Sequence, residues 1–72
     1  MKLKDLLKYI DMWEIIRIYT QDSPDDECAW VGNICDMPWI YAESEIDSNM
    51  EYPIHLNIDE AKPEIVVSVI TK

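Results

Sequence analysis

Apolar side chains recur at helical spacing in the first eleven residues. Four of them fall at positions i, i+3, i+4 and i+7, with Lys and Asp on the other side: Leu3, Leu6, Leu7 and Ile10. About ten residues are too few to be helical alone in water, so these side chains must dock onto another layer. The pattern predicts a helix over Met1–Asp11 that packs across a sheet.

Four later segments have the composition of β-strands. Trp13–Thr20 and Cys28–Cys35 are rich in β-branched and aromatic residues and flank the acidic loop 21–27, which predicts a hairpin with a long tip. Over 54–59, apolar residues alternate strictly with polar ones, which is typical of a strand with one wet face. The near-continuous apolar run Ile65–Thr71 indicates either a central strand or an exposed edge that dimerises.

The segment between these strand pairs carries a helix-start signal. Asp36 can cap free backbone donors and Pro38 is tolerated in a first turn, so we expect a short helix there. After Ala42 the pattern changes to period two, which predicts a turn or two of helix passing into an exposed strand. A helix through to Ile46 is the alternative. Gly32, within its strand, indicates a bulge or a close backbone approach.

The order helix, strand, strand, short helix, strand, strand predicts one small α+β domain over residues 1–72. We expect a curved antiparallel sheet of about four strands with the first helix packed across one face. A chain of 72 residues buries only about 60% of its unfolded surface, which leaves no room for a second domain. The apolar content of 49%, with three Trp and four Tyr, is that of a folded protein.

Charge is segregated along the chain. The formal net charge is −9, and the stretch from Ile18 to Ala61 holds eleven Asp or Glu and no Lys or Arg. Nucleic acids and anionic membranes are bound through clustered cations, so direct binding to either is not expected. The acidic middle is either a solubilising surface or a recognition surface for a basic partner. With no signal-like start and no apolar stretch of membrane-spanning length, we expect a cytoplasmic protein.

Residues for catalysis or metal binding do not form a known pattern. Cys28, Cys35 and His55 lack any zinc-ligand spacing, and no serine lies in a nucleophile elbow. On a strand, the two cysteines lie too far apart for a disulfide. Carboxylate pairs are the one enzymatic ingredient present, but general acid–base work needs a pocket that a chain this short has little room for. We therefore expect no enzyme, no cofactor and no metal site.

An aromatic pair beside alternating carboxylates is the candidate partner-binding site. Aromatic anchors with a charged rim are typical of protein interfaces. If the segment after residue 42 is extended, its alternate carboxylates stand about 6.7 Å apart, a spacing comparable with that of backbone phosphates. With the acidic hairpin tip, the candidate residues are Trp39, Tyr41, Glu43, Glu45, Asp47, Asp25, Asp26 and Glu27.

Four segments together resemble small uncharacterised acidic proteins encoded by Firmicutes phages and prophages. These are MKLKDLLKYID, WEIIRIY, WVGNICDMPW and the later hydrophobic β run. The most distinctive part is a W-x-G strand leading into D-M-P: Trp30, Gly32, Asp36, Met37 and Pro38. The resemblance implies a phage accessory protein of the host cytosol. Short acidic proteins of this kind include inhibitors of host defence, anti-CRISPR proteins among them.

Three classes of function follow from these observations. The first is a non-catalytic inhibitor whose acidic face covers the basic, nucleic-acid-binding surface of a protein partner. The second is a small structural protein that self-associates through a strand edge. The third, a minimal metal-dependent hydrolase, would require tight binding of a divalent ion. We expect the first.

Overall fold

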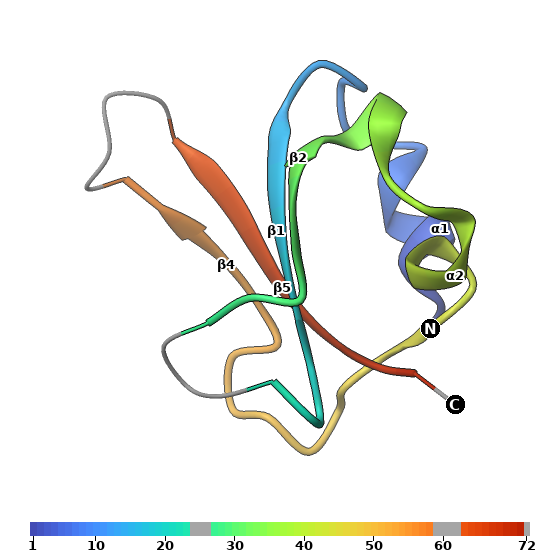
Figure 1. Ribbon diagram of the computed structural model, residues 1–72, viewed down its shortest axis with the longest axis vertical. Coiled ribbons are helices and arrows are strands. Elements are labelled where there is room, and N and C mark those ends of the chain that lie inside the picture. Colours follow the sequence, from blue (N-terminus) through green and yellow to red (C-terminus); the bar gives the residue numbers. More distant parts are fainter. Residues whose placement is uncertain (24–26, 59–62, 72) are drawn as a thin grey trace.

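The computed structural model shows a five-stranded mixed sheet with its short helices gathered on one side (Figure 1). It describes residues 1–23, 27–58 and 63–71. In chain order the elements are α1 (Leu3–Leu7), β1 (Ile15–Thr20), β2 (Trp30–Asn33), a 3-10 helix (Ile34–Asp36), α2 (Trp39–Ala42), β3 (Glu45–Ile46), β4 (Ile54–Asn57) and β5 (Glu64–Ile70). The predicted α+β class is confirmed.

Strand β5 lies at the centre of the sheet. It pairs with β1 on one side and with both β3 and β4 on the other, while β2 pairs with the far side of β1. Of the two predicted positions for this apolar run, a central strand or an exposed edge, the structure shows the central strand. The expected antiparallel sheet of about four strands is wrong in count and direction, because β1 and β5 are parallel from Ile15↔Glu64 to Thr20↔Val69. β5 is antiparallel to β4 and, on its other side, parallel to β1.

The core lies between the sheet and the helices. Six residues from both layers are almost or wholly buried there: Leu3, Ile16, Ile18, Ile34, Val67 and Val69. Ile18 and Val67 are register partners on adjacent strands, so their side chains share one sheet face. Val66 is also buried but pairs with Arg17, whose side chain stands on the opposite face. Burial is therefore concentrated on the face that the helices cover.

The first helix is shorter than the sequence predicts. α1 ends at Leu7, and the chain then tightens into turns in which Tyr9 N donates to Leu6 O and Ile10 N donates to Leu7 O. The predicted apolar stripe does face the core. Leu3 is fully buried, and the other three members pack against it partly exposed. The helix length is wrong and the docking face is confirmed.

The second helix starts later than predicted. Asp36 ends the 3-10 helix, and Met37 and Pro38 are extended, with ψ of 132° and 138°. A residue that precedes proline is disfavoured in the helical region, so Met37 cannot continue from Asp36 into α2. Asp36 is therefore not the cap of α2; Pro38 holds that position. The expected passage from a short helix into a strand is confirmed, since α2 ends at Ala42 and β3 begins at Glu45.

Strand β2 is also shorter than the predicted segment 28–35. Cys35 lies in the 3-10 helix, and both cysteines are free thiols. The bulge or close backbone approach predicted at Gly32 is wrong, because the β1–β2 register is uninterrupted and the nearest atoms belong to a side chain. A Cβ at Gly32 would lie 3.0 Å from two ring carbons of Trp30, whose indole packs against the core. A side chain at residue 32 would therefore require the ring of Trp30 to shift slightly.

Strand β4 has the predicted alternation, but its apolar side is not covered. Ile54 and Leu56 alternate with His55 and Asn57 along the strand. Both apolar residues are exposed, and so is the following Ile58, because the helices lie over the opposite part of the sheet (Figure 1). The hairpin tip at 24–26 and most of the predicted turn at 59–64 lie outside the described residues.

Candidate functional site

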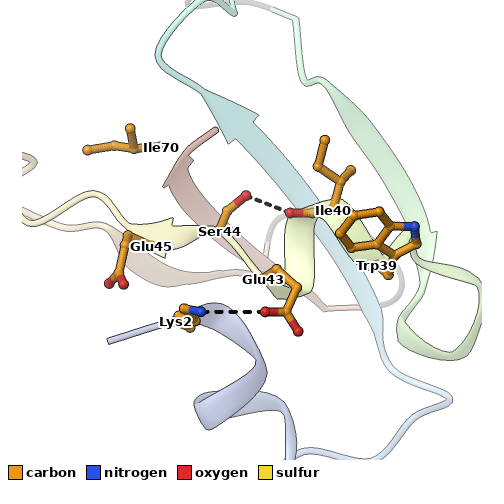
Figure 2. Close-up of a pocket in the computed structure, with 7 residues that line it drawn as sticks. All are labelled: Lys2, Trp39, Ile40, Glu43, Ser44, Glu45 and Ile70. Carbon is orange, nitrogen blue, oxygen red and sulfur yellow. Dashed lines mark hydrogen bonds and ion pairs between the residues drawn. The ribbon is translucent and has the colours of Figure 1, made fainter. Parts of the chain in front are cut away.

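An open hollow of about 580 Å³ forms where α2, β3 and the first residues of the chain meet. Figure 2 shows the seven residues that line it: Lys2, Trp39, Ile40, Glu43, Ser44, Glu45 and Ile70. We call this site the Trp39 hollow. It brings together three of the residues that the sequence singled out as partner-binding: Trp39, Glu43 and Glu45.

Backbone hydrogen bonds to the first three residues hold one wall of the Trp39 hollow. Leu3 N donates to Ser44 O at 3.0 Å, and Ile46 N donates to Met1 O at 2.9 Å. The buried Ser44 in turn donates its hydroxyl to the carbonyl of Ile40 at 2.7 Å. These bonds tie α2 and β3 to the N-terminal segment, so the hollow is a built feature of the fold.

Carboxylates at the Trp39 hollow are paired with cations from the first turn of the chain. Glu43 accepts hydrogen bonds from Lys4 at 3.2 Å and from Lys2 at 3.5 Å. The hydrogen bond from Lys4 is the main reason that the pKa of Glu43 lies below its usual range. Glu45 pairs with the ammonium group of Met1 at 3.1 Å. All of these groups are about half exposed, so the pairs are weak and can be exchanged for other cations.

The aromatic side of the Trp39 hollow is open to solvent. Trp39 is 75% exposed, and neighbouring Ile40 is also exposed. In Figure 2 Glu43 lies between the indole of Trp39 and the side chain of Glu45. An indole face attracts Arg and Lys side chains, and carboxylates bind their charged ends. The hollow thus places an exposed indole and two carboxylates on one surface.

The remaining predicted residues lie elsewhere. Tyr41 is half-buried and packs against the core. Asp47 lines a different groove, on the sheet face away from the helices. Glu27 is exposed, and Asp25 and Asp26 fall outside the described residues.

A regular ladder of carboxylates is not formed. Such a ladder requires an extended chain from Glu43 to Asp47, but only Glu45–Ile46 is strand and Glu43 is the helical C-cap of α2. The predicted spacing of about 6.7 Å therefore does not apply. The acids of the Trp39 hollow form a local cluster rather than a row.

Sequence reasoning missed the residues that complete the hollow. Ile70 and Ser44 come from elements whose contacts depend on the sheet order, and no local pattern marks them. One signal for Lys2 was available. Three of the six Lys and Arg residues lie in the first eight positions, outside the acidic middle, and could neutralise its carboxylates.

A second groove, of about 750 Å³, runs over the uncovered sheet face. Arg17 crosses this face and binds Glu64 in a bidentate pair, with Nε at 2.9 Å and Nη2 at 3.2 Å from its oxygens. The hydrogen bond from Arg17 lowers the pKa of Glu64, and the reverse contact raises the pKa of Arg17. Because Glu64 already satisfies this guanidinium, the groove holds no unpaired Arg for an anionic ligand.

The described residues contain no group of three His, Cys, Asp or Glu able to hold a metal ion. No helix within the described part of the chain is long and apolar enough to cross a membrane. Comparisons with protein-family models, with curated proteins and with solved structures found no match to this chain. The fold and the hollow therefore define the class: a small α+β domain whose surface site combines an exposed indole with carboxylates paired to cations.

Proposed function

We propose that this protein is a non-catalytic binding module that docks on a basic protein surface through the Trp39 hollow. The observation that carries the proposal is that the exposed Trp39 lines the same hollow as the carboxylates of Glu43 and Glu45. The partner inserts a Lys or Arg side chain, whose stem packs on the indole and whose charge displaces the weak internal pairs.

The net charge of the chain also favours a cationic partner. A net charge of −9 steers a cationic surface toward the protein and repels nucleic acid. A partner whose cationic groove normally holds DNA or RNA meets both conditions. Occupying that groove would inhibit the partner, as expected of a phage-encoded inhibitor of a host defence enzyme.

A basic peptide tests the site directly. Titration calorimetry with a deca-arginine peptide at low salt measures its affinity for the parent and for Trp39→Ala. We expect this substitution to weaken binding about fivefold, since an exposed cation–π contact contributes about 1 kcal/mol. The matched control is Trp13→Ala, because Trp13 is 76% exposed and lies outside the hollow. Equal losses in both variants would show that the hollow is not the site.

A second pair of variants separates the site from bulk charge. Glu43→Gln with Glu45→Gln and Glu14→Gln with Glu51→Gln each remove two negative charges, and all four residues are exposed. The first pair should weaken peptide binding more than the second and flatten its salt dependence. Identical affinities for the two pairs would reduce the effect to net charge and contradict the proposal.

Inhibition needs its own measurement. A labelled DNA duplex bound to a nuclease with a cationic groove should be released as this protein is added, with lower fluorescence anisotropy. Trp13→Ala should release the duplex as the parent does, and Trp39→Ala should require more protein. Retention of the duplex at saturating protein, when the peptide still binds, would leave a binding module without the inhibitory role.

A further inference from the structure

Strand β4 forms an open edge of the sheet. Within the described residues it pairs with β5 alone. Ser68 N donates to Pro53 O at 2.8 Å, so Pro53 and Ser68, which face each other just before β4, form a hydrogen-bonded pair. Hydrogen-bonded pairs alternate in an antiparallel ladder, so His55 and Asn57 direct their backbone groups toward β5. The backbone groups of Ile54, Leu56 and Ile58 therefore point outward, away from the sheet.

The side chains on this edge are apolar and uncovered. Ile54, Leu56 and Ile58 are 38%, 58% and 70% exposed and share one face of the strand by alternation. The helices lie over the other part of the sheet (Figure 1). An outward row of backbone donors and acceptors beside three apolar side chains is a template for another strand.

The central part of this edge, residues 54–58, carries no charge or proline that would keep another strand away. Natural edges carry Lys, inward charges, Pro or bulges to prevent pairing. Residues 54–58 contain no Asp, Glu, Lys, Arg or Pro, although the chain as a whole carries a charge of −9. The opposite edge is less suited, because β2 exposes only Val31 among its large apolar side chains. No charged side chain within residues 54–58 therefore opposes the approach of a second copy.

We propose that two copies of this chain pair through β4, antiparallel about a two-fold axis at Leu56. In this register Leu56 faces Leu56 of the second copy, and Ile54 faces Ile58. The outward backbone groups of these residues then bond across the interface, and all six apolar side chains gather on one face. His55 faces Asn57 on the other face, so no like charges meet. A second copy fits because the strand is complementary to itself in this register.

Sedimentation of the parent and two lysine variants tests the interface. We expect a monomer–dimer equilibrium in the range of about 10–100 µM, because the interface is one short strand per copy. Leu56→Lys should weaken it by more than about tenfold. Met12→Lys is the matched control, since Met12 is also 58% exposed and gains the same charge. A monomeric parent at 1 mM, or equal effects of both lysines, would overturn the proposal.

Proline and salt test the backbone pairing and the charge. Leu56→Pro removes an outward donor and leaves the β4–β5 ladder intact, so it should abolish the dimer while the circular dichroism spectrum stays that of the parent. Higher salt should tighten the parent dimer, because it screens two chains of charge −9. Dimers that persist with Leu56→Pro would show that β4 does not pair.

Cross-linking tests the register. With Cys28 and Cys35 replaced by Ser, Leu56→Cys should form an intermolecular disulfide under oxidised glutathione, because facing Cα atoms lie about 5.5 Å apart in such a pair. Ile54→Cys alone should not, since it faces Ile58. Efficient cross-linking of Ile54→Cys would refute the register. These variants leave the Trp39 hollow unchanged, so peptide binding through it should persist in each, and the two proposals fail independently.

Discussion

Replacing Leu3 by Ala removes the contact that docks the N-terminal segment on the sheet. Leu3 is fully buried, and its backbone N–H bonds the carbonyl of Ser44. α1 has only five residues and is not stable without docking, so the leucine side chain holds the helix in place. The substitution therefore affects both the core and the wall of the Trp39 hollow.

The magnitude follows from burial. Truncating a fully buried leucine to alanine costs about 3–5 kcal/mol, and the low end applies here because a five-residue helix can relax toward the cavity. A domain of this length has a total stability of about 4–11 kcal/mol. Its unfolding entropy is about 150 cal/mol/K, so a loss of about 3 kcal/mol lowers Tm by about 20 °C.

Thermal and urea unfolding followed by Trp fluorescence measures this effect. Leu6→Ala is the control on the same helix, because Leu6 is only partly buried and should cost clearly less. We also expect Leu3→Ala to weaken peptide binding at the hollow. A fall in Tm of less than about 5 °C, or one no larger than that of Leu6→Ala, would refute the role given to Leu3.

Two further predictions concern the sheet. Gly32→Ala should lower the free energy of unfolding by at least about 1 kcal/mol more in the parent than in a Trp30→Ala background, because the added Cβ meets the indole only in the parent. Urea unfolding of the parent, both single variants and the double variant measures this coupling. Its absence would contradict the close packing of Gly32 against Trp30. The hydrogen bond from Arg17 lowers the pKa of Glu64, so its ionised form stabilises the fold above the unfolded pKa of about 4.3 and this contribution is lost as pH falls through the lower folded value. Urea midpoints at pH 7 and pH 3 should therefore differ less for Glu64→Gln than for the parent, while Glu14→Gln, an exposed carboxylate, should match the parent.

Local patterns identified most of the elements of this fold. The strand segments, the docking face of the first helix and the α+β class follow from hydrophobic periodicity, which reports which side of an element is covered. Periodicity does not report which strands pair with each other in the sheet. The parallel β1–β5 pair joins Arg17 and Glu64, 47 positions apart, and nothing near either residue encodes that contact.

The candidate site was predictable only where its residues lie close together in the sequence. Trp39, Glu43 and Glu45 lie close in sequence, so a local pattern could group them. Asp47 was placed with them by alternation, but the strand at Glu45–Ile46 is too short to carry that alternation through. The pairing of the acids with Lys2 and Lys4 depends on where the N-terminal segment packs, which the tertiary fold decides.

The central position of β5 sets the order in which the chain can fold during synthesis. β1, β3 and β4 each take their partner from residues 64–70, so before these are added only the β1–β2 hairpin can form. Until then the core lacks Val67 and Val69, which β5 supplies. Folding must close the long loop between β1 and β5, which slows it compared with a helical protein of equal length.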